Sequence, residues 1–107
     1  MSNIRDNGVW ITEGIRYNNE LTFAEKFIVS ELIWHCEKSL EGASTAPNKR
    51  WEEAYGISEQ GVIGIISSLI RKGFVVKNLQ KHETDGVWRT TRLLQITNKT
   101  LDLLIWK

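Results

Sequence analysis

The chain has 107 residues, of which 41% are hydrophobic, and a formal net charge of +1. This length suits one domain with a single hydrophobic core. The only cysteine, Cys36, leaves no pair for an intramolecular disulfide, so a reducing cytoplasm is the expected compartment. No apolar run approaches the roughly 20 residues that span a bilayer, and residues 1–16 lack the apolar segment of a signal peptide, so we expect no membrane contact.

The charge is unevenly distributed along the chain. Residues 1–46 carry four basic and seven acidic side chains, a net charge of −3, whereas residues 47–107 carry ten basic and six acidic side chains, a net charge of +4. An excess of cations in one half is typical of a protein that binds a polyanion, although it also keeps an ordinary surface soluble. The second half is therefore the first place to look for a binding surface.

The N-terminal part predicts an extended arm, over residues 1–21, followed by a helix. Residues 9–11 are apolar and residues 17–20 are rich in turn formers. The run from Thr22 to Glu25 is a capping box, which starts a helix of about 15 residues. Its expected inward side chains are Phe23, Phe27, Ile28, Leu32 and Cys36, and its expected outward ones are Glu25, Lys26, Glu31, Glu37 and Lys38.

The central part predicts two further helices. Residues 42–46 break the first helix and can hold a brief strand, after which Pro47 suits the start of a short helix over 48–55, closed by Gly56. Ser58 is a good N-cap for the third helix, which ends at Gly73. The inward stripe of that helix is Val62, Ile65, Ile66, Leu69 and Ile70.

From Phe74 onward the pattern is that of a β-hairpin. Residues 74–77 are strand formers, Asp85-Gly86 is a turn dipeptide, and residues 87–96 return as a second strand. Asn98 is the expected cap of a C-terminal helix over residues 98–107, with Leu101, Leu104 and Ile105 on one face.

This order of elements is that of a winged helix-turn-helix. The run Gly56-Ile57-Ser58, then Val62 and Ile66, and then residues 69–75 resemble the pattern of bacterial winged-helix DNA-binding domains. Residues 21–26 and 46–48 further resemble the N-terminal domain of phage and plasmid replication initiators. The resemblance implies an α+β fold in one domain, with a three-helix core and a two-stranded wing over residues 22–97, plus the C-terminal helix.

The resemblance also implies binding of double-stranded DNA, in replication initiation or transcriptional regulation of a phage or mobile element. Residues 58–72 would lie in the major groove, residues 48–50 would lie near the backbone, and the hairpin over residues 77–92 would be the wing. Helix-start amides near Ser58 would face a phosphate. The candidate DNA-binding residues are Asn48, Lys49, Arg50, Ser58, Gln60, Ile63, Gly64, Ser67, Arg71, Lys77, Lys81, His82 and Arg89.

The third helix departs from the family because its groove-facing positions are poor in polar side chains. Gly61, Ile63 and Gly64 stand where relatives often carry threonine, serine or arginine, so Gln60, Ser67 and Arg71 remain as readers of base edges. Two glycines inside a helix cost about 1 kcal/mol each relative to alanine. Either DNA or another helix must therefore approach closely, and the sequence leaves this choice open.

Each sharp interpretation has a plain alternative. The third helix can be an ordinary core helix, and Lys77, Lys81, Arg89 and Arg92 can simply be the solvated face of a hairpin whose edges are protected by charge. The rival function is a winged helix that binds another protein, for which an exposed Trp88 or Trp106 would be a marker. The apolar residues Leu101, Leu103, Leu104, Ile105 and Trp106 also suggest a homodimer through the C-terminal helix.

No pattern in the chain indicates catalysis. His35, Cys36 and His82 lack the spacing of a zinc site, and Glu52 and Glu53 are neighbours that point to different faces of a helix. There is no phosphate-binding glycine loop and no nucleophile with an evident base. We therefore expect no enzyme activity, no metal, no cofactor and no small-molecule substrate.

Overall fold

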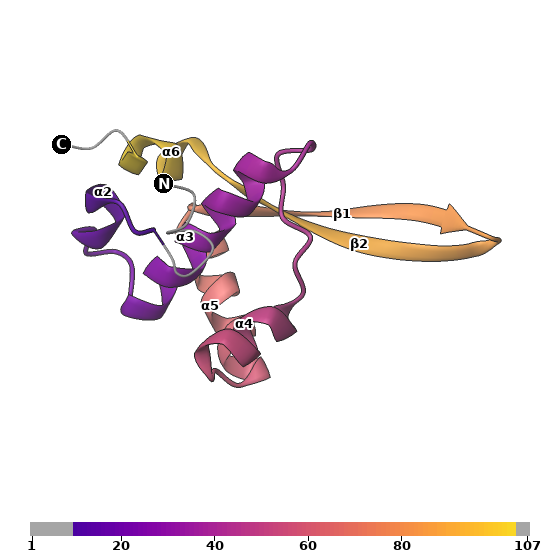
Figure 1. The fold of residues 1–107 in the computed structure, drawn as a ribbon, viewed down its shortest axis with the longest axis horizontal. Coiled ribbons are helices and arrows are strands. Elements are labelled where there is room, and N and C mark those ends of the chain that lie inside the picture. The colour runs from indigo at the N-terminus through magenta and orange to yellow at the C-terminus, as the bar shows by residue number, and fades with distance from the viewer. Residues whose placement is uncertain (1–9, 105–107) are drawn as a thin grey trace.

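The computed structural model describes residues 10–104, and these form an α+β fold in which the helices make one body and a hairpin projects from it (Figure 1). The principal extents of the molecule are 50 × 29 × 28 Å, and the hairpin accounts for the long axis. None of the helices within 10–104 is long and apolar enough to cross a membrane. The elements are α2 (Glu13–Arg16), α3 (Phe23–Lys38), α4 (Asn48–Tyr55), α5 (Glu59–Arg71), β1 (Val75–Thr84), β2 (Val87–Ile96) and α6 (Asn98–Leu104).

The prediction of an extended N-terminal arm is wrong for its second half. Residues 13–16 form the short helix α2, in which Ile15 is fully buried. A helix of one turn is too short to show an apolar periodicity, so the sequence pattern could not predict it. In the structure it is held by the burial of Ile15 in the core. Residues 1–9, including Val9 of the predicted apolar run, lie outside the described residues.

Helix α3 begins as predicted, and Ile28 and Leu32 of its expected inward residues are buried, but the buried face is shifted at its first turn. The capping box is present, because the Glu25 amide donates to Thr22 Oγ1 at 3.2 Å and the Thr22 amide donates to Glu25 Oε1 at 2.8 Å. Phe23, expected inside, is 78% exposed, whereas Glu25, expected outside, is 3% exposed. Glu31 is also largely covered. The buried apolar face of the helix is made of Ile28, Val29, Leu32 and Ile33.

Glu25 is buried because a cation from a distant part of the chain meets it. Lys72 Nζ, at the end of α5, lies 2.8 Å from Glu25 Oε1. Lys99 Nζ of α6 in turn donates to the Lys72 carbonyl at 2.8 Å. Desolvation raises the pKa of Glu25, but hydrogen bonds from Lys72, Ser68 and Thr22 outweigh it, so the pKa lies below its usual value. This cluster joins the start of α3 to the end of α5.

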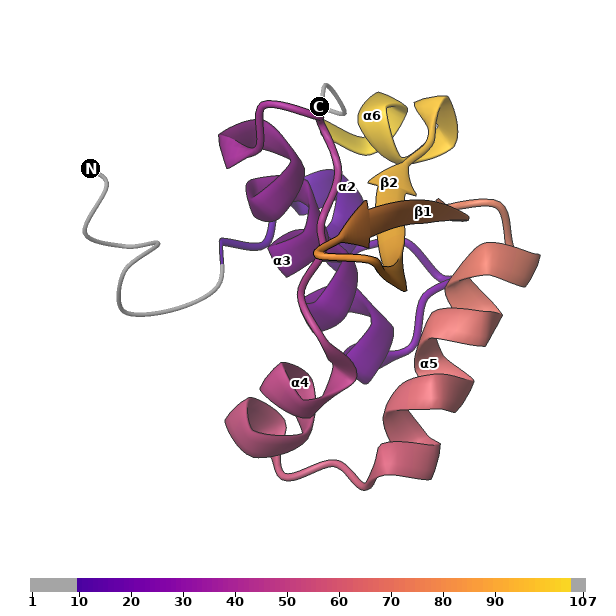
Figure 2. The same ribbon diagram turned by 90° about the vertical axis from the view of Figure 1, so that its right-hand side faces the viewer.

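The pair α4 and α5 follows the sequence prediction closely. α4 has the expected bounds, and Gly56 ends it in the left-handed conformation at φ 66°. Ser58 caps α5, since its Oγ accepts from the Gly61 amide at 3.1 Å. Viewed along the hairpin, α4 and α5 lie below the strands and are joined at the bottom by this turn (Figure 2). The expected stripe of α5 is confirmed: Val62, Ile66 and Leu69 are buried, and Ile65 and Ile70 are partly buried.

The predicted hairpin is confirmed. Only its stem, the end nearest the helices, packs against the core. β1 and β2 pair antiparallel from Val75↔Ile96 to Thr84↔Val87, around a tight turn in which Asp85 and Gly86 have φ of 54° and 79°. Val75 is buried at the stem, but residues 76–90 are all exposed. The brief strand predicted within residues 42–46 is a single bridge, in which Ser44 and Leu94 exchange both backbone hydrogen bonds.

The C-terminal helix α6 is present, but its expected cap is one residue too late in the sequence. The cap position is Thr97, whose carbonyl accepts from the Leu101 amide at 3.0 Å, so Asn98 is the first helical residue. Leu101 is 44% exposed, whereas Thr100 is buried and donates its hydroxyl to the Phe74 carbonyl. Residues 105–107 lie outside the described range, so the predicted contribution of Ile105 and Trp106 stays a prediction.

Replacing Glu25 with alanine removes both the capping-box acceptor and the carboxylate partner of Lys72. We expect the free energy of unfolding to fall by about 2 kcal/mol, the scale of a hydrogen bond to a charged group. Urea denaturation followed by tryptophan fluorescence measures it. The control is Glu41→Ala, at an exposed site after α3, which should change stability by less than about 0.5 kcal/mol. An equal loss in both variants would contradict the role of the cluster.

Candidate nucleic-acid interface

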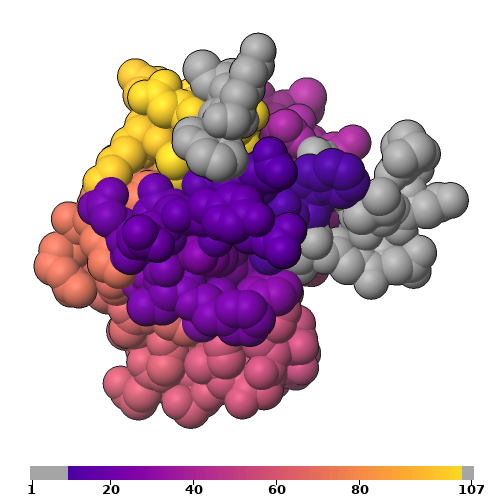
Figure 3. Space-filling view, turned by 90° about the vertical axis from the view of Figure 1, so that its left-hand side faces the viewer, coloured from indigo at the N-terminus to yellow at the C-terminus, as the bar shows by residue number. Residues whose placement is uncertain are grey.

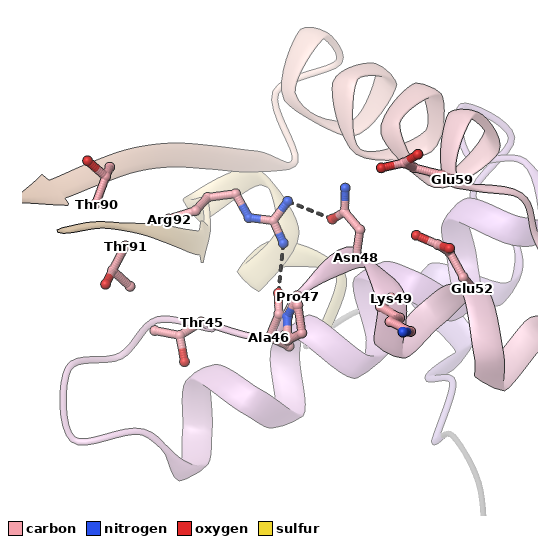
Figure 4. Close-up of a pocket in the computed structure, with 10 residues that line it drawn as sticks. All are labelled: Thr45, Ala46, Pro47, Asn48, Lys49, Glu52, Glu59, Thr90, Thr91 and Arg92. Atoms are coloured by element: carbon pink, nitrogen blue, oxygen red, sulfur yellow. Dashed lines mark hydrogen bonds between the residues drawn. The ribbon is translucent and has the colours of Figure 1, made fainter.

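An open concavity of about 720 Å³ lies between α4, the start of α5 and the stem of the hairpin. Figure 4 shows side chains from all three elements around it. The concavity therefore lies where the two predicted binding elements, the third helix and the hairpin, come together. It is lined by Thr45, Ala46, Pro47, Asn48, Lys49, Glu52, Glu59, Thr90, Thr91 and Arg92.

Arg92 fixes the hairpin to the start of α4. Its Nη1 donates to Asn48 Oδ1 at 2.6 Å and its Nη2 donates to the Ala46 carbonyl at 2.7 Å (Figure 4). Burial lowers the pKa of this guanidinium from its usual value. Arg92, weighed in the sequence as a cation of the wing, is thus a structural residue, and one acceptor of Asn48 is already occupied.

The charge inside the concavity is mixed. Lys49 of α4 is exposed, but Glu52 and Glu59 add two carboxylates to the same concavity (Figure 4). Thr90 and Thr91 add hydroxyl groups from the hairpin. The concavity is therefore no strong anion site by itself.

The outer face of α5 is exposed as predicted. Ile63 is 41% exposed, and Arg71 Nη2 lies 3.4 Å from Ser68 Oγ. The exposed residues recur at three- or four-residue spacing, so they form one stripe along the helix. This stripe consists of Gln60, Ile63, Gly64, Ser67 and Arg71. Ser58, also a predicted site residue, uses its hydroxyl oxygen as the helix cap.

The two glycines within α5 have different causes. A Cβ at Gly61 would lie 2.6 Å from Ile57 Cγ2, so close packing of the preceding turn requires glycine there. A Cβ at Gly64 would meet nothing within 4 Å. Internal packing therefore explains why residue 61 is glycine. No contact within the described residues explains why residue 64 is glycine.

The hairpin cations lie on both faces of the two strands. In an antiparallel pair, directly opposite residues share a face and neighbours along a strand alternate. Lys77 and Lys81 consequently lie on the face of the buried Leu94, whereas His82 and Arg89, which are directly opposite each other, lie on the other face. All four are exposed. This division follows from the hairpin register together with the alternation of side chains along each strand.

Arg50 does not line the concavity with Asn48 and Lys49. Its Nε lies 3.4 Å from Glu31 Oε2 of α3, and the same oxygen accepts from Trp51 Nε1 at 3.1 Å. Tyr55 donates its hydroxyl to the other oxygen of Glu31. Desolvation and the hydrogen bond to Glu31 raise the pKa of Tyr55. Arg50 therefore belongs to the network that holds α4 against α3.

His35 and Cys36 also have structural partners. His35 Nδ1 lies 2.9 Å from Ser44 Oγ, and its ring stacks near Trp51 with a centroid distance of 6.3 Å. Cys36 Sγ lies 3.6 Å from the Leu94 carbonyl, and burial raises the pKa of the thiol. Residues 10–104 contain no group of three side chains able to hold a metal ion.

Sequence reasoning missed five of the residues that line the concavity. Thr45, Glu52, Glu59, Thr90 and Thr91 carry no motif of their own. The turn dipeptide at Asp85-Gly86 does fix the hairpin register, so the position of the two hairpin threonines relative to Arg92 was available in principle. The approach of α4 to the hairpin was not, because it depends on the contact between Arg92 and Asn48.

No protein-family model, no curated protein and no solved structure matches this chain.

The position of His35 predicts a loss of stability on acidification. Desolvation and the Arg50 charge lower its pKa below 6.5, against a smaller opposite effect of Glu31. As the pH falls, the unfolded chain therefore takes up the proton first, so this contribution to stability is complete above about pH 6.5 and declines below it. Urea denaturation at about pH 7 and pH 5.5 should show the decline.

The matched pair of variants for this effect is His35→Asn and His82→Asn. The first retains a nitrogen near Ser44 and should show a smaller decline between the two pH values. The second changes an exposed hairpin histidine and should decline as the unmodified chain does. A decline of equal size in all three proteins would refute the role of His35.

Proposed function

We propose that this chain binds double-stranded DNA as a winged helix-turn-helix, with α4 and α5 as the helix-turn-helix and β1–β2 as the wing. The observation that carries the proposal is that α4, the first residue of α5 and β2 line one concavity (Figure 4), while the α5 stripe and the hairpin cations Lys77, Lys81 and Arg89 are exposed. A helix fits the major groove, and cations on a flanking element offset phosphate charge. No chemistry on the DNA is involved.

Contacts to the phosphate backbone dominate the proposed complex. The α5 stripe offers Gln60 and Ser67 as polar readers, with Ile63 suited to a thymine methyl group. Lys49, Lys77, Lys81 and Arg89 are exposed and have no partner among residues 10–104. The balance favours sequence-independent affinity over base readout. The resemblance to replication initiators supports a role in replication or transcriptional regulation of a phage or mobile element.

A second candidate function is binding of another protein through the hairpin. Its support is the exposure of three apolar side chains there: Leu79 is 63% exposed, Val87 is 51% exposed and Trp88 is 68% exposed. Exposed aromatic residues are common at protein interfaces. Salt separates the two functions, because phosphate contacts weaken steeply as salt rises and apolar contacts do not.

Fluorescence anisotropy with random duplex DNA at low and moderate salt tests the proposal. We expect binding at low micromolar protein that weakens steeply with salt, and weaker binding by Lys81→Gln and Arg89→Gln on every sequence. Each variant should reduce the slope of log affinity against log salt by about 0.9 if its cation contacts one phosphate.

The matched control removes a cation from the far end of the molecule. Arg16 belongs to α2, which lies on the face opposite the hairpin (Figure 3). Arg16→Gln carries the same change of net charge, so it should bind DNA nearly as the unmodified chain does. Absence of binding at low salt, or an equal loss in all three variants, would refute the proposed interface.

Gly64→Ala separates stability from binding. An alanine there meets no neighbour, so it should stabilise the helix by up to about 1 kcal/mol in urea denaturation. If α5 lies in the groove with Gly64 against the DNA, the added methyl group should weaken DNA binding several-fold in the same titration. A stabilised variant with unchanged affinity would show that DNA does not approach this position.

A further inference from the structure

The outer edge of β1 is an unpaired strand edge. The hairpin has two strands, and within residues 10–104 only β2 gains a further partner, through the bridge between Leu94 and Ser44. Residues 76–84 are exposed throughout. The edge is long for one that no other element covers, and such edges are templates for pairing with another strand.

The hydrogen-bond pattern shows which residues of β1 present their backbone outward. Leu94 exchanges both of its backbone bonds with Ser44, so its amide and carbonyl point away from β1. Its opposite residue, Lys77, must then point its own amide and carbonyl away from β2. Because the pattern alternates along an antiparallel pair, Leu79, Lys81 and Glu83 do the same.

We propose that β1 pairs antiparallel with β1 of a second copy of this chain, about a twofold axis at Gln80, to form a four-stranded sheet. In this register Lys77 lies opposite Glu83 of the second copy, twice by symmetry. The residues whose backbone groups point outward then lie opposite one another, and each opposite pair exchanges two backbone hydrogen bonds. The two Leu79 side chains lie diagonally across the axis, on one face of the sheet, where each gains an apolar neighbour.

Charge selects this register among those that a twofold axis permits. A twofold axis perpendicular to the sheet leaves each face of the sheet on the same side. Directly opposite residues of two strands must point to the same face, and neighbouring residues point to opposite faces, so the axis passes through a residue and not between two. An axis at Leu79 would place Lys77 opposite Lys81, and an axis at Lys81 would place that lysine opposite itself. An axis at Asn78 pairs no opposite charges.

An axis at His82 would pair Lys81 with Glu83, but it leaves only residues 80–84 overlapped. The axis at Gln80 overlaps Val76–Thr84, nearly the whole strand. It is therefore the register with both the long overlap and the matched charges. The lysines that would otherwise protect this edge from pairing are, in this register, opposite Glu83 and Leu79 of the second copy.

The proposed pairing leaves the concavity open but engages Lys77 and Lys81, so in the dimer the phosphate contacts proposed above would fall to Lys49 and Arg89. The concavity is lined by Thr90, Thr91 and Arg92 of β2, and residues 44–47 run beside that strand, not beside β1. The hairpin residues that line the concavity therefore belong to β2 and not to the strand that pairs with the second copy. The inference does not rest on the proposed DNA function, and its test is made without DNA.

Sedimentation velocity of the full chain, over about 1 to 100 µM protein, tests the pairing by charge exchange. We expect a dimer for the unmodified chain, and Lys77→Glu and Glu83→Lys should each weaken it by about 10-fold or more, because each creates two like-charge pairs. The double variant K77E/E83K restores opposite charges and should recover the dimer. Lys81→Glu is the control, since Lys81 faces Leu79 of the second copy.

A cross-link tests the axis itself. In a Cys36→Ser background, Gln80→Cys should form a disulfide-linked dimer on oxidation, because opposite residues of a non-hydrogen-bonded pair have Cα atoms about 4.5 Å apart. Thr91→Cys, directly opposite Gln80 within the hairpin, should not cross-link because it lies one strand further from the axis.

A chain that is monomeric throughout the concentration range overturns the proposal. A dimer whose affinity is unchanged by both single charge changes also overturns the proposal. A dimer formed through the C-terminal helix would behave in this way. Failure of the double variant to recover the dimer, with Gln80→Cys also failing to cross-link, rejects the register. Circular dichroism of each variant confirms that the exposed substitutions leave the fold intact.

Discussion

The relation between the hairpin and the helices depends on one guanidinium. Arg92 contacts Asn48 and the Ala46 carbonyl, and two residues further along β2 the Ser44–Leu94 bridge holds the same segment of chain. Without these contacts the hairpin stem would rest on the core through Val75, Leu94 and the partly buried Ile96. Because Asn48 begins α4, the same contacts set the position of the hairpin relative to the helix pair. The concavity between them exists for this reason.

The excess of positive charge in the second half of the chain has two separate uses. Lys72, Lys99, Arg50 and Arg92 all have partners inside the fold, and the first three are paired with acidic residues of the first half. Much of the charge asymmetry thus serves to hold the two halves together. The exposed cations Lys49, Lys77, Lys81 and Arg89 lie at the concavity and along the hairpin, and the proposed contact with a polyanion rests on them.

Local signals predicted the parts of this fold that local chemistry determines. The bounds of α4, the cap at Ser58, the capping box at Thr22 and the turn at Asp85-Gly86 all follow from residues within one or two turns. Contacts between distant residues decided the rest. The helical pattern placed Glu25 on the outward face of α3, but in the structure Glu25 pairs with Lys72, 47 positions later. Likewise, Arg92 looked like a free cation, and only the approach of Asn48 shows otherwise.

The length of the hairpin is the strongest argument that this protein has a large partner. A two-stranded hairpin beyond the support of a core is only marginally stable in water, and here the exposed part carries Leu79, Val87 and Trp88 to solvent. Such an extension gains stability when its strands meet another surface. Its two edges differ, since β2 adjoins the concavity and Ser44, whereas the outer edge of β1 offers unpaired backbone groups together with Lys77, Lys81 and Glu83. Under the two proposals the β2 edge would meet a nucleic acid and the β1 edge a second strand, and Lys77 and Lys81 are the side chains that both proposals use.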